Sequence, residues 1–252
     1  MGFLDLTNGL INNMSKIDIL AFGAHPDDVE LGCAGTILLQ TSLGAKVGVI
    51  DLTKGELGTR GNTFIRKKEA DIAANKMNLI FRENLGFQDG FFENNEQNKL
   101  AVITKIRAYQ PSIILCNTNF DRHPDHGRAS DLIYDACFLS GLEKITTTYN
   151  NIVQKPHRPQ ALYNYLQYND QKPDFVVDIS KFMNLKMDVI KSYSSQFYNP
   201  ESNESDTLIS KKSFLDLVKN RCADLGRFIS VDYAEGFLTN RYLGSRNLFD
   251  LL

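Results

Sequence analysis

Residues capable of chemistry first gather where an apolar run ends near the start of the chain. The segment IDILAFGAHPDDVE places His25, Asp27, Asp28 and Glu30 within six residues. A histidine beside carboxylates can supply metal ligands together with a general base. Aspartates at the start of a helix can also merely cap it and complement its dipole. This segment alone leaves both interpretations open.

A second cluster of ionisable residues follows another apolar run, at 112–116. It contains His123, Asp125 and His126, and like the first cluster it includes a His-Pro pair. Proline disfavours the α region for the residue before it, so each of these pairs predicts an extended loop before a helix. A single cluster of this kind could be surface decoration. Two clusters after equivalent strands favour one shared site, because the carboxyl ends of parallel strands lie at one sheet edge, where His25, Asp28 and His126 could converge.

These residue types point to metal-assisted hydrolysis. Two histidines and one carboxylate can hold a divalent metal and leave a fourth position for water, whose pKa the metal lowers towards neutral. A neighbouring carboxylate can take up the proton and return it to the leaving group, so Asp27 and Asp28 would divide into one ligand and one general base. In the second cluster, His126 would bind the metal. His123, held by Asp125, would stabilise the developing oxyanion.

The elements that must position both clusters alternate along the chain. Apolar runs predict strands over 17–22, 46–52 and 112–116, and helices are expected over 29–43, 63–77, 96–109 and 127–140. The residues 78–85 are interpreted as a short apolar link that leads into a turn. Near-continuous apolar strands that alternate with helices predict an α/β fold, Rossmann-like, with three layers and a mostly parallel sheet.

The pattern changes beyond residue 141. An aromatic-rich strand is expected over 161–168 with 175–179 as its partner, followed by helices over 181–193 and 210–226. No linker-like composition separates this part from the rest. We therefore expect a single domain over 1–252, with a core at about 17–180 and a small C-terminal lobe at about 181–252.

Composition excludes several classes of protein. The chain has 252 residues with 28 basic and 30 acidic side chains, so no broad positive field attracts nucleic acid or anionic lipid. No apolar run approaches the roughly 20 residues of a membrane span. The first 16 residues lack the pattern of a secretory leader or a myristoylation motif, and the four widely spaced cysteines are typical of reduced core residues. These features predict a cytoplasmic enzyme with a small-molecule substrate and neither a membrane nor a nucleic-acid partner.

The two clusters also carry a family resemblance. The segments AHPDDVE (24–30) and HPDH (123–126) resemble the two signature motifs of the LmbE/PIG-L family of zinc-dependent N-acetylglucosamine deacetylases. Further segments look like the bacillithiol-biosynthesis branch, which deacetylates N-acetylglucosaminyl malate: DLTKGELGTRG (51–61), NLGFQDGF (84–91), 121–130, SQFYNP (195–200) and YAEGF (233–237). The resemblance covers about residues 17–238.

By position, the resemblance implies a role for each residue of the two motifs. The metal ligands would be His25, Asp28 and His126, with Zn²⁺ or another divalent metal such as Fe²⁺. Asp27 would be the general base, and His123 paired with Asp125 would stabilise the oxyanion. The family also implies a homo-oligomer, of which a hexamer is one form.

Substrate binding is expected to involve arginines. Arg66 and Arg158 match family positions that line the sugar pocket, and Arg60 joins them as a partner for the malate carboxylates, since guanidinium binds carboxylate in a bidentate way. One departure concerns a tyrosine of the C-terminal lobe that relatives offer to the oxyanion, because Phe214 stands there in this chain. Tyr193 and Tyr198 are candidates for its role.

Other functions are kept as alternatives. The substrate could instead be free or oligomeric N-acetylglucosamine, or a mycothiol-like conjugate. A rival of another class is a non-catalytic sugar- or nucleotide-binding module. The lack of a G-x-G-x-x-G segment after the first strand counts against the nucleotide-binding form.

Overall fold

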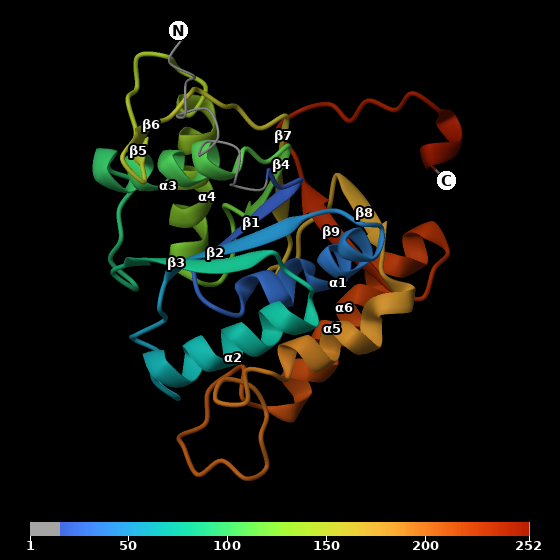
Figure 1. Cartoon of the computed structure of the whole chain (residues 1–252). Coiled ribbons are helices and arrows are strands. Elements are labelled where there is room, and N and C mark those ends of the chain that lie inside the picture. The colour runs from blue at the N-terminus through green and yellow to red at the C-terminus, as the bar shows by residue number, and fades with distance from the viewer. Residues whose placement is uncertain (1–15, 252) are drawn as a thin grey trace, which may run out of the picture.

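The computed structural model describes residues 16–251, so the expectation drawn from the first residues about a leader or lipid motif lies almost entirely outside the described part. A seven-stranded sheet with the order β3-β2-β1-β4-β7-β9-β8 forms the centre (Figure 1). Its strands are β1 (Ile19–Gly23), β2 (Val47–Thr53), β3 (Phe81–Phe87), β4 (Ile113–Asn117), β7 (Ala161–Tyr165), β8 (Phe175–Asp178) and β9 (Ala234–Leu238). A small hairpin consists of β5 (Thr148–Tyr149) and β6 (Ile152–Val153).

Helices cover both faces of this sheet. They are α1 (Asp28–Ser42), α2 (Thr63–Lys76), α3 (Glu96–Tyr109), α4 (Pro124–Leu139), α5 (Met183–Ile190) and α6 (Lys212–Gly226), with short 3₁₀ helices η2 (Ser180–Phe182), η3 (Arg227–Ile229) and η4 (Leu248–Leu251). Alternate residues of β1 enter different cores: Ile19 and Ala21 pack with α1, α2, α5 and α6, whereas Leu20 and Phe22 pack with α3 and α4. The predicted three-layer α/β fold with a mostly parallel sheet is therefore confirmed.

Two expectations about the strands are wrong. The residues 78–85 were expected to form a link, but β3 covers most of this stretch and pairs in parallel with β2. The strand at 175–179 was expected to pair with the aromatic strand before it, but β9 lies between β7 and β8 and pairs antiparallel with both. The division into a core and a C-terminal lobe near residue 180 stays a prediction. The position of β9 means that both parts contribute strands to one sheet.

The strand order determines where a ligand site can form. The chain runs from β1 outward through β2 to β3, and then returns to place β4 on the other side of β1. In parallel sheets, the loops that leave the two strands at such a switch point diverge and open a crevice at their carboxyl ends. Among residues 16–251, no helix combines the length and the apolar composition that crossing a membrane requires.

Candidate active site

Both sequence clusters lie at this crevice. The first cluster occupies the turn from β1 into α1, and the second occupies the turn from β4 into α4. The strands β1 and β4 are neighbours in parallel register, so the two turns leave the same sheet edge side by side. Gly23 permits the close turn after β1, because an added Cβ atom would lie 3.0 Å from the carbonyl oxygen of His25.

Three of the predicted ligands converge in the crevice. The carboxylate of Asp28 lies between two imidazoles, with Oδ2 3.4 Å from Nδ1 of His25 and Oδ1 3.1 Å from Nε2 of His126. All three side chains are buried. Two ligand atoms bound to a tetrahedral zinc ion, each at about 2.0–2.1 Å, lie roughly 3.3 Å apart. Each distance uses a different oxygen of Asp28, and the chemistry of these donors fits a divalent metal.

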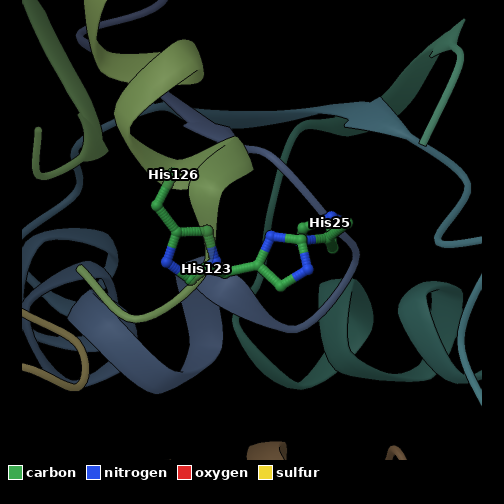
Figure 2. A group of neighbouring side chains, drawn as sticks. All are labelled: His25, His123 and His126. Atoms are coloured by element: carbon green, nitrogen blue, oxygen red, sulfur yellow. The ribbon is translucent and has the colours of Figure 1, made fainter. Parts of the chain in front are cut away.

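Two other groupings of potential ligands share His25. One combines His25 with His123 and His126, which Figure 2 shows as a group of neighbouring side chains, and the other combines His25 with Asp89 and Asp125. We favour the set with Asp28, because that carboxylate contacts both His25 and His126. Burial alone would raise the pKa of Asp28, but the adjacent His126 and hydrogen bonds from both histidines hold that pKa well below its usual value.

In His25 and His126, the ring nitrogen that does not face Asp28 contacts other carboxylates. Asp121 Oδ2 lies 2.8 Å from Nδ1 of His126, while Asp89 Oδ1 and Asp125 Oδ2 lie 3.0 and 3.2 Å from Nε2 of His25. Such contacts orient metal-binding imidazoles and increase their basicity. The opposite nitrogens, Nδ1 of His25 and Nε2 of His126, are left facing Asp28.

Asp28 is fixed by amide side chains as well. The Nε2 group of Gln167 donates to its Oδ1 atom at 2.7 Å, and the Nδ2 group of Asn117 donates to its Oδ2 atom at 3.2 Å. Both amides come from the ends of strands on the same side of β1, Asn117 from β4 and Gln167 just after β7. The candidate ligand set is thus preorganised by neighbouring strands.

His123 and Asp125 contact each other through the backbone of Asp125 and not through its carboxylate. The Asp125 carboxylate contacts His25, the backbone N–H of Gly90 and the guanidinium of Arg128. The backbone N–H of Asp125 instead donates to Nδ1 of His123 at 3.2 Å. The side chain of Asp125 therefore holds a candidate ligand, and only its backbone holds His123.

His123 is arranged as a hydrogen-bond donor. Because its Nδ1 atom accepts a hydrogen bond, the proton of a neutral ring is on Nε2. Burial lowers the pKa of His123, and the neighbouring charges of His25 and His126 lower it further, so the neutral form is favoured.

Asp27 does not act as a side-chain helix cap. Its backbone has φ 119° and ψ −20°, and its side chain makes no capping hydrogen bond to α1. One carboxylate oxygen instead accepts from Nη2 of Arg66 at 3.0 Å. Burial raises the pKa of Asp27 to about 7 even though the Arg66 guanidinium opposes this shift. The pKa of this carboxyl therefore matches that of a general base working near neutral pH.

A pocket of about 310 Å³ opens over these groups. Its wall combines the candidate site residues with segments from the second half of the chain, including Gln167, Tyr168, Gln196, Thr207, Leu208, Ile209 and Phe214. The arginines that line it are Arg66 and Arg122, and Arg122 lies 5.2 Å from the ring centroid of Tyr168. The pocket therefore has a cationic side next to an aromatic surface.

Two of the three predicted substrate-binding arginines lie elsewhere. Arg60 is buried and binds Ser202 and Glu204 instead of lining the pocket. Arg158 precedes β7, near its amino end, where it donates to the carbonyl of Phe138 at 2.9 Å. The expectation that these two arginines line the pocket is thus not met within one chain.

Neither tyrosine proposed to replace the missing hydroxyl at Phe214, Tyr193 or Tyr198, lines the pocket. Phe214 lines the pocket as expected. Tyr193 is fully buried and donates its hydroxyl to Glu30 at 3.0 Å, whereas Tyr198 is partly exposed and does not line the pocket. Tyr168, which stacks near Phe214, is the aromatic hydroxyl that does line it.

Sequence reasoning missed several residues of this site: Asp89, Asn117, Asp121, Arg122, Gln167 and Tyr168. Asp121 and Arg122 directly precede the second motif, so their position after a strand was a usable signal. Asp89 follows an unrecognised strand, and Gln167 follows a strand whose neighbours were assigned incorrectly.

Comparison with known proteins shows which family the chain belongs to. Residues 20–137 match the family described as "PIG-L: GlcNAc-PI de-N-acetylase". A solved structure, the conserved protein TT1542 from Thermus thermophilus, is 32% identical with a TM-score of 0.81, over 91% of this chain and 98% of that one. This chain belongs to the PIG-L family.

Two similar proteins are named as deacetylases of different N-acetylglucosamine compounds. The chain is 28% identical to the diacetylchitobiose deacetylase of Thermococcus kodakarensis, over 75% of this chain and 73% of the relative. It is also 28% identical to the probable N-acetyl-alpha-D-glucosaminyl L-malate deacetylase 2 of Bacillus subtilis, over 72% and 84%. The PIG-L match includes both histidine clusters, so the candidate site lies in the part of the chain that carries the family resemblance.

Proposed function

We propose that this PIG-L-family chain is a metal-dependent hydrolase that removes the N-acetyl group of an N-acetylglucosamine derivative. The observation that carries this proposal is the convergence of His25, Asp28 and His126 beside a buried carboxyl, Asp27, whose pKa is about 7. Relatives named as deacetylases support the same reaction class. Zn²⁺ is the proposed metal, and another divalent ion such as Fe²⁺ suits the same ligands.

The proposed mechanism divides the work between neighbouring residues. His25, Asp28 and His126 would hold a divalent metal, which would supply Lewis acidity that lowers the pKa of water and polarises the amide carbonyl. Asp27 accepts the proton of the attacking water and returns it to the amine that leaves. The Nε2–H group of His123 donates a hydrogen bond to the oxyanion as it develops. Arg66 holds the Asp27 carboxylate in place through its ion pair.

N-acetylglucosaminyl malate is the proposed substrate, as in bacillithiol biosynthesis. Its support is the relative from Bacillus subtilis together with two guanidinium groups in the pocket wall, Arg66 and Arg122. Guanidinium groups bind carboxylates through paired hydrogen bonds, and malate carries two carboxylates. Arg66 is engaged with Asp27, so Arg122 is the better candidate for the malate end.

The alternative substrates have support of the same weight. Diacetylchitobiose is an uncharged oligomer of N-acetylglucosamine, and a deacetylase for it is equally similar to this chain. A mycothiol-like conjugate also remains an alternative. Diacetylchitobiose and N-acetylglucosaminyl malate share the N-acetylglucosamine group but differ in the group attached to it.

Acetate release from purified, zinc-loaded protein tests both the deacetylase activity and the choice of substrate. We expect turnover of N-acetylglucosaminyl malate to exceed that of diacetylchitobiose, and Arg122→Met to reduce turnover of the malate conjugate while leaving diacetylchitobiose turnover close to wild type. Equal loss with both substrates would contradict the role of Arg122 in malate binding. No acetate from any N-acetylglucosamine derivative would overturn the deacetylase itself.

Assembly and location remain proposals too. We propose a cytoplasmic homo-oligomer, and a hexamer is the form that the family resemblance implies. Light scattering of the purified chain measures its mass directly, and a mass of 28.5 kDa, that of one chain, would contradict an oligomer.

A further inference from the structure

Helix α1 is interrupted about one turn after Asp28. Cys33 has φ −145° and ψ 18°, values outside the helical region, and the residues on both sides of it are buried. In an unbroken helix the carbonyl of Leu31 would accept a hydrogen bond from the N–H of Gly35. Buried backbone groups that lose such a partner need another, because water cannot reach them.

A buried ion pair occupies this interruption. Lys186 of α5 donates from Nζ to the carbonyl of Leu31 at 2.8 Å. Glu235 of β9 accepts from the N–H of Gly35 at 2.9 Å and from the N–H of Thr36 at 2.7 Å. The two charged groups also contact each other, and each side chain is only 1% exposed. The pair thus binds three backbone groups that an unbroken α1 would use in its own hydrogen bonds.

Each charge faces the helix end of opposite polarity. The ammonium of Lys186 lies at the carbonyl end of the first segment, 28–32, and the carboxylate of Glu235 lies at the N–H end of the second segment, 34–42. Burial would lower the pKa of Lys186, but the adjacent Glu235 raises it above its usual value. Lys186 therefore stays charged, and the contacts of the two side chains hold both segments at once.

The first segment is short and carries part of the candidate metal site. It begins with Asp28, and its Glu30 side chain is bound by Arg82 and by the hydroxyl of Tyr193. At its far end, Gly32 packs so closely on Tyr165 that an added Cβ atom would lie 2.1 Å from the ring. The contacts at the break add to these in holding the segment that begins with Asp28.

We propose that Lys186 and Glu235 are positioning residues of the metal centre, which hold the break in α1 and so direct the carboxylate of Asp28 towards His25 and His126. This inference rests on the proposed metal-dependent function. Neither residue lines the pocket, so both act through the backbone of α1 and not on the substrate. The competing explanation is that the pair stabilises the fold alone.

Metal affinity separates these two explanations. The variants are Glu235→Gln and the double variant Lys186→Met/Glu235→Gln, which avoids leaving a lone buried charge and is therefore expected to fold if the single variant does not. Arg107→Met is the matched control. Arg107 is a buried cation that donates to the backbone carbonyls of Ser140 and Leu142, on the opposite face of the sheet from α1.

The measurements are the thermal midpoint, the Kd for Zn²⁺ and Co²⁺ by competition with a chelator, and the visible spectrum of the Co²⁺ form. We expect both Glu235 variants to bind the ions about 10- to 100-fold more weakly, with an altered Co²⁺ spectrum, as for other residues that orient ligands. Arg107→Met should lose thermal stability yet keep the wild-type Kd and spectrum.

Wild-type Kd and spectrum in the Glu235 variants, with a lower thermal midpoint only, would overturn the positioning role. If the wild-type chain itself binds neither ion, the proposed metal-dependent function fails first, and that failure is distinct because it shows in the unmodified protein.

Discussion

At the scale of single residues, one backbone torsion separates the roles of two adjacent aspartates. Asp28 is the first residue of α1, and its carboxylate faces two histidines. Asp27 has a φ of 119°, which is uncommon for a residue with a side chain and turns its carboxylate towards Arg66. The same residue type thus serves two proposed purposes within one dipeptide.

Replacement of Asp27 by Asn tests this division. The amide keeps the size of the side chain but cannot take up a proton at neutral pH, so we expect kcat to fall by about 10²- to 10⁴-fold. Zinc content should stay at the wild-type level, because the proposed ligands are unchanged. Acetate release and metal analysis of the same sample check both statements, and full activity in the variant would exclude Asp27 as the base.

The proposed ligands could be predicted from the sequence because the turns after β1 and β4 carry them in compact motifs. The partners that long, charged side chains contact could not be predicted in this way. Arg60 and Arg158 have the residue type that binds carboxylates, but their partners are Glu204 and the carbonyl of Phe138. Such partners lie 20 or more positions away, so local sequence does not reveal them.

At the scale of elements, the loop after β2 is joined to a distant wall of the pocket. Arg60 binds Ser202 and Glu204, the N–H of Gly61 donates to Glu204 at 2.8 Å, and the residues that follow, from Thr207 to Ile209, line the pocket. Arg60 therefore ties two loops together instead of binding substrate directly.

We expect Arg60→Met to loosen residues 199–206. Limited proteolysis should cut this segment several-fold faster than in the wild type, and KM should rise more than kcat falls, because the proposed catalytic groups are untouched. Arg227→Met is a suitable control, since it removes an exposed ion pair with Asp224. Unchanged proteolysis together with a higher KM would favour direct substrate binding by Arg60.

Two strands escaped prediction for physical reasons. The strand β3 contains Arg82 and Glu83, and adjacent charges are typical of an exposed segment. The side chain of Arg82 is nevertheless only 4% exposed, where it pairs with Asp51 and Glu30. The strand β9 contains Glu235, whose burial is explained by α1, some 200 positions away in sequence. A buried charge is recognisable only once its partner is known.

At the scale of the whole molecule, the candidate metal would link the two motif-bearing turns. A ligand that binds only the folded state stabilises it by RT ln(1 + [L]/Kd), about 2.7 kcal/mol at one hundred times Kd. We therefore expect the thermal midpoint to rise with Zn²⁺ concentration and to fall with chelator. His126→Ala should abolish this dependence, and a midpoint independent of Zn²⁺ in the wild type would contradict the site.

The position of β9 has a consequence for the order in which the molecule can be completed. During synthesis β7 and β8 emerge first, but in the finished sheet β9, which is made later, lies between them. Pairings between segments far apart in sequence form slowly. The native sheet therefore cannot be completed until residues 234–238 have been made. Since this strand also brings Glu235 to α1, we expect nascent chains that stop before it to hold the two histidine turns without a finished metal centre.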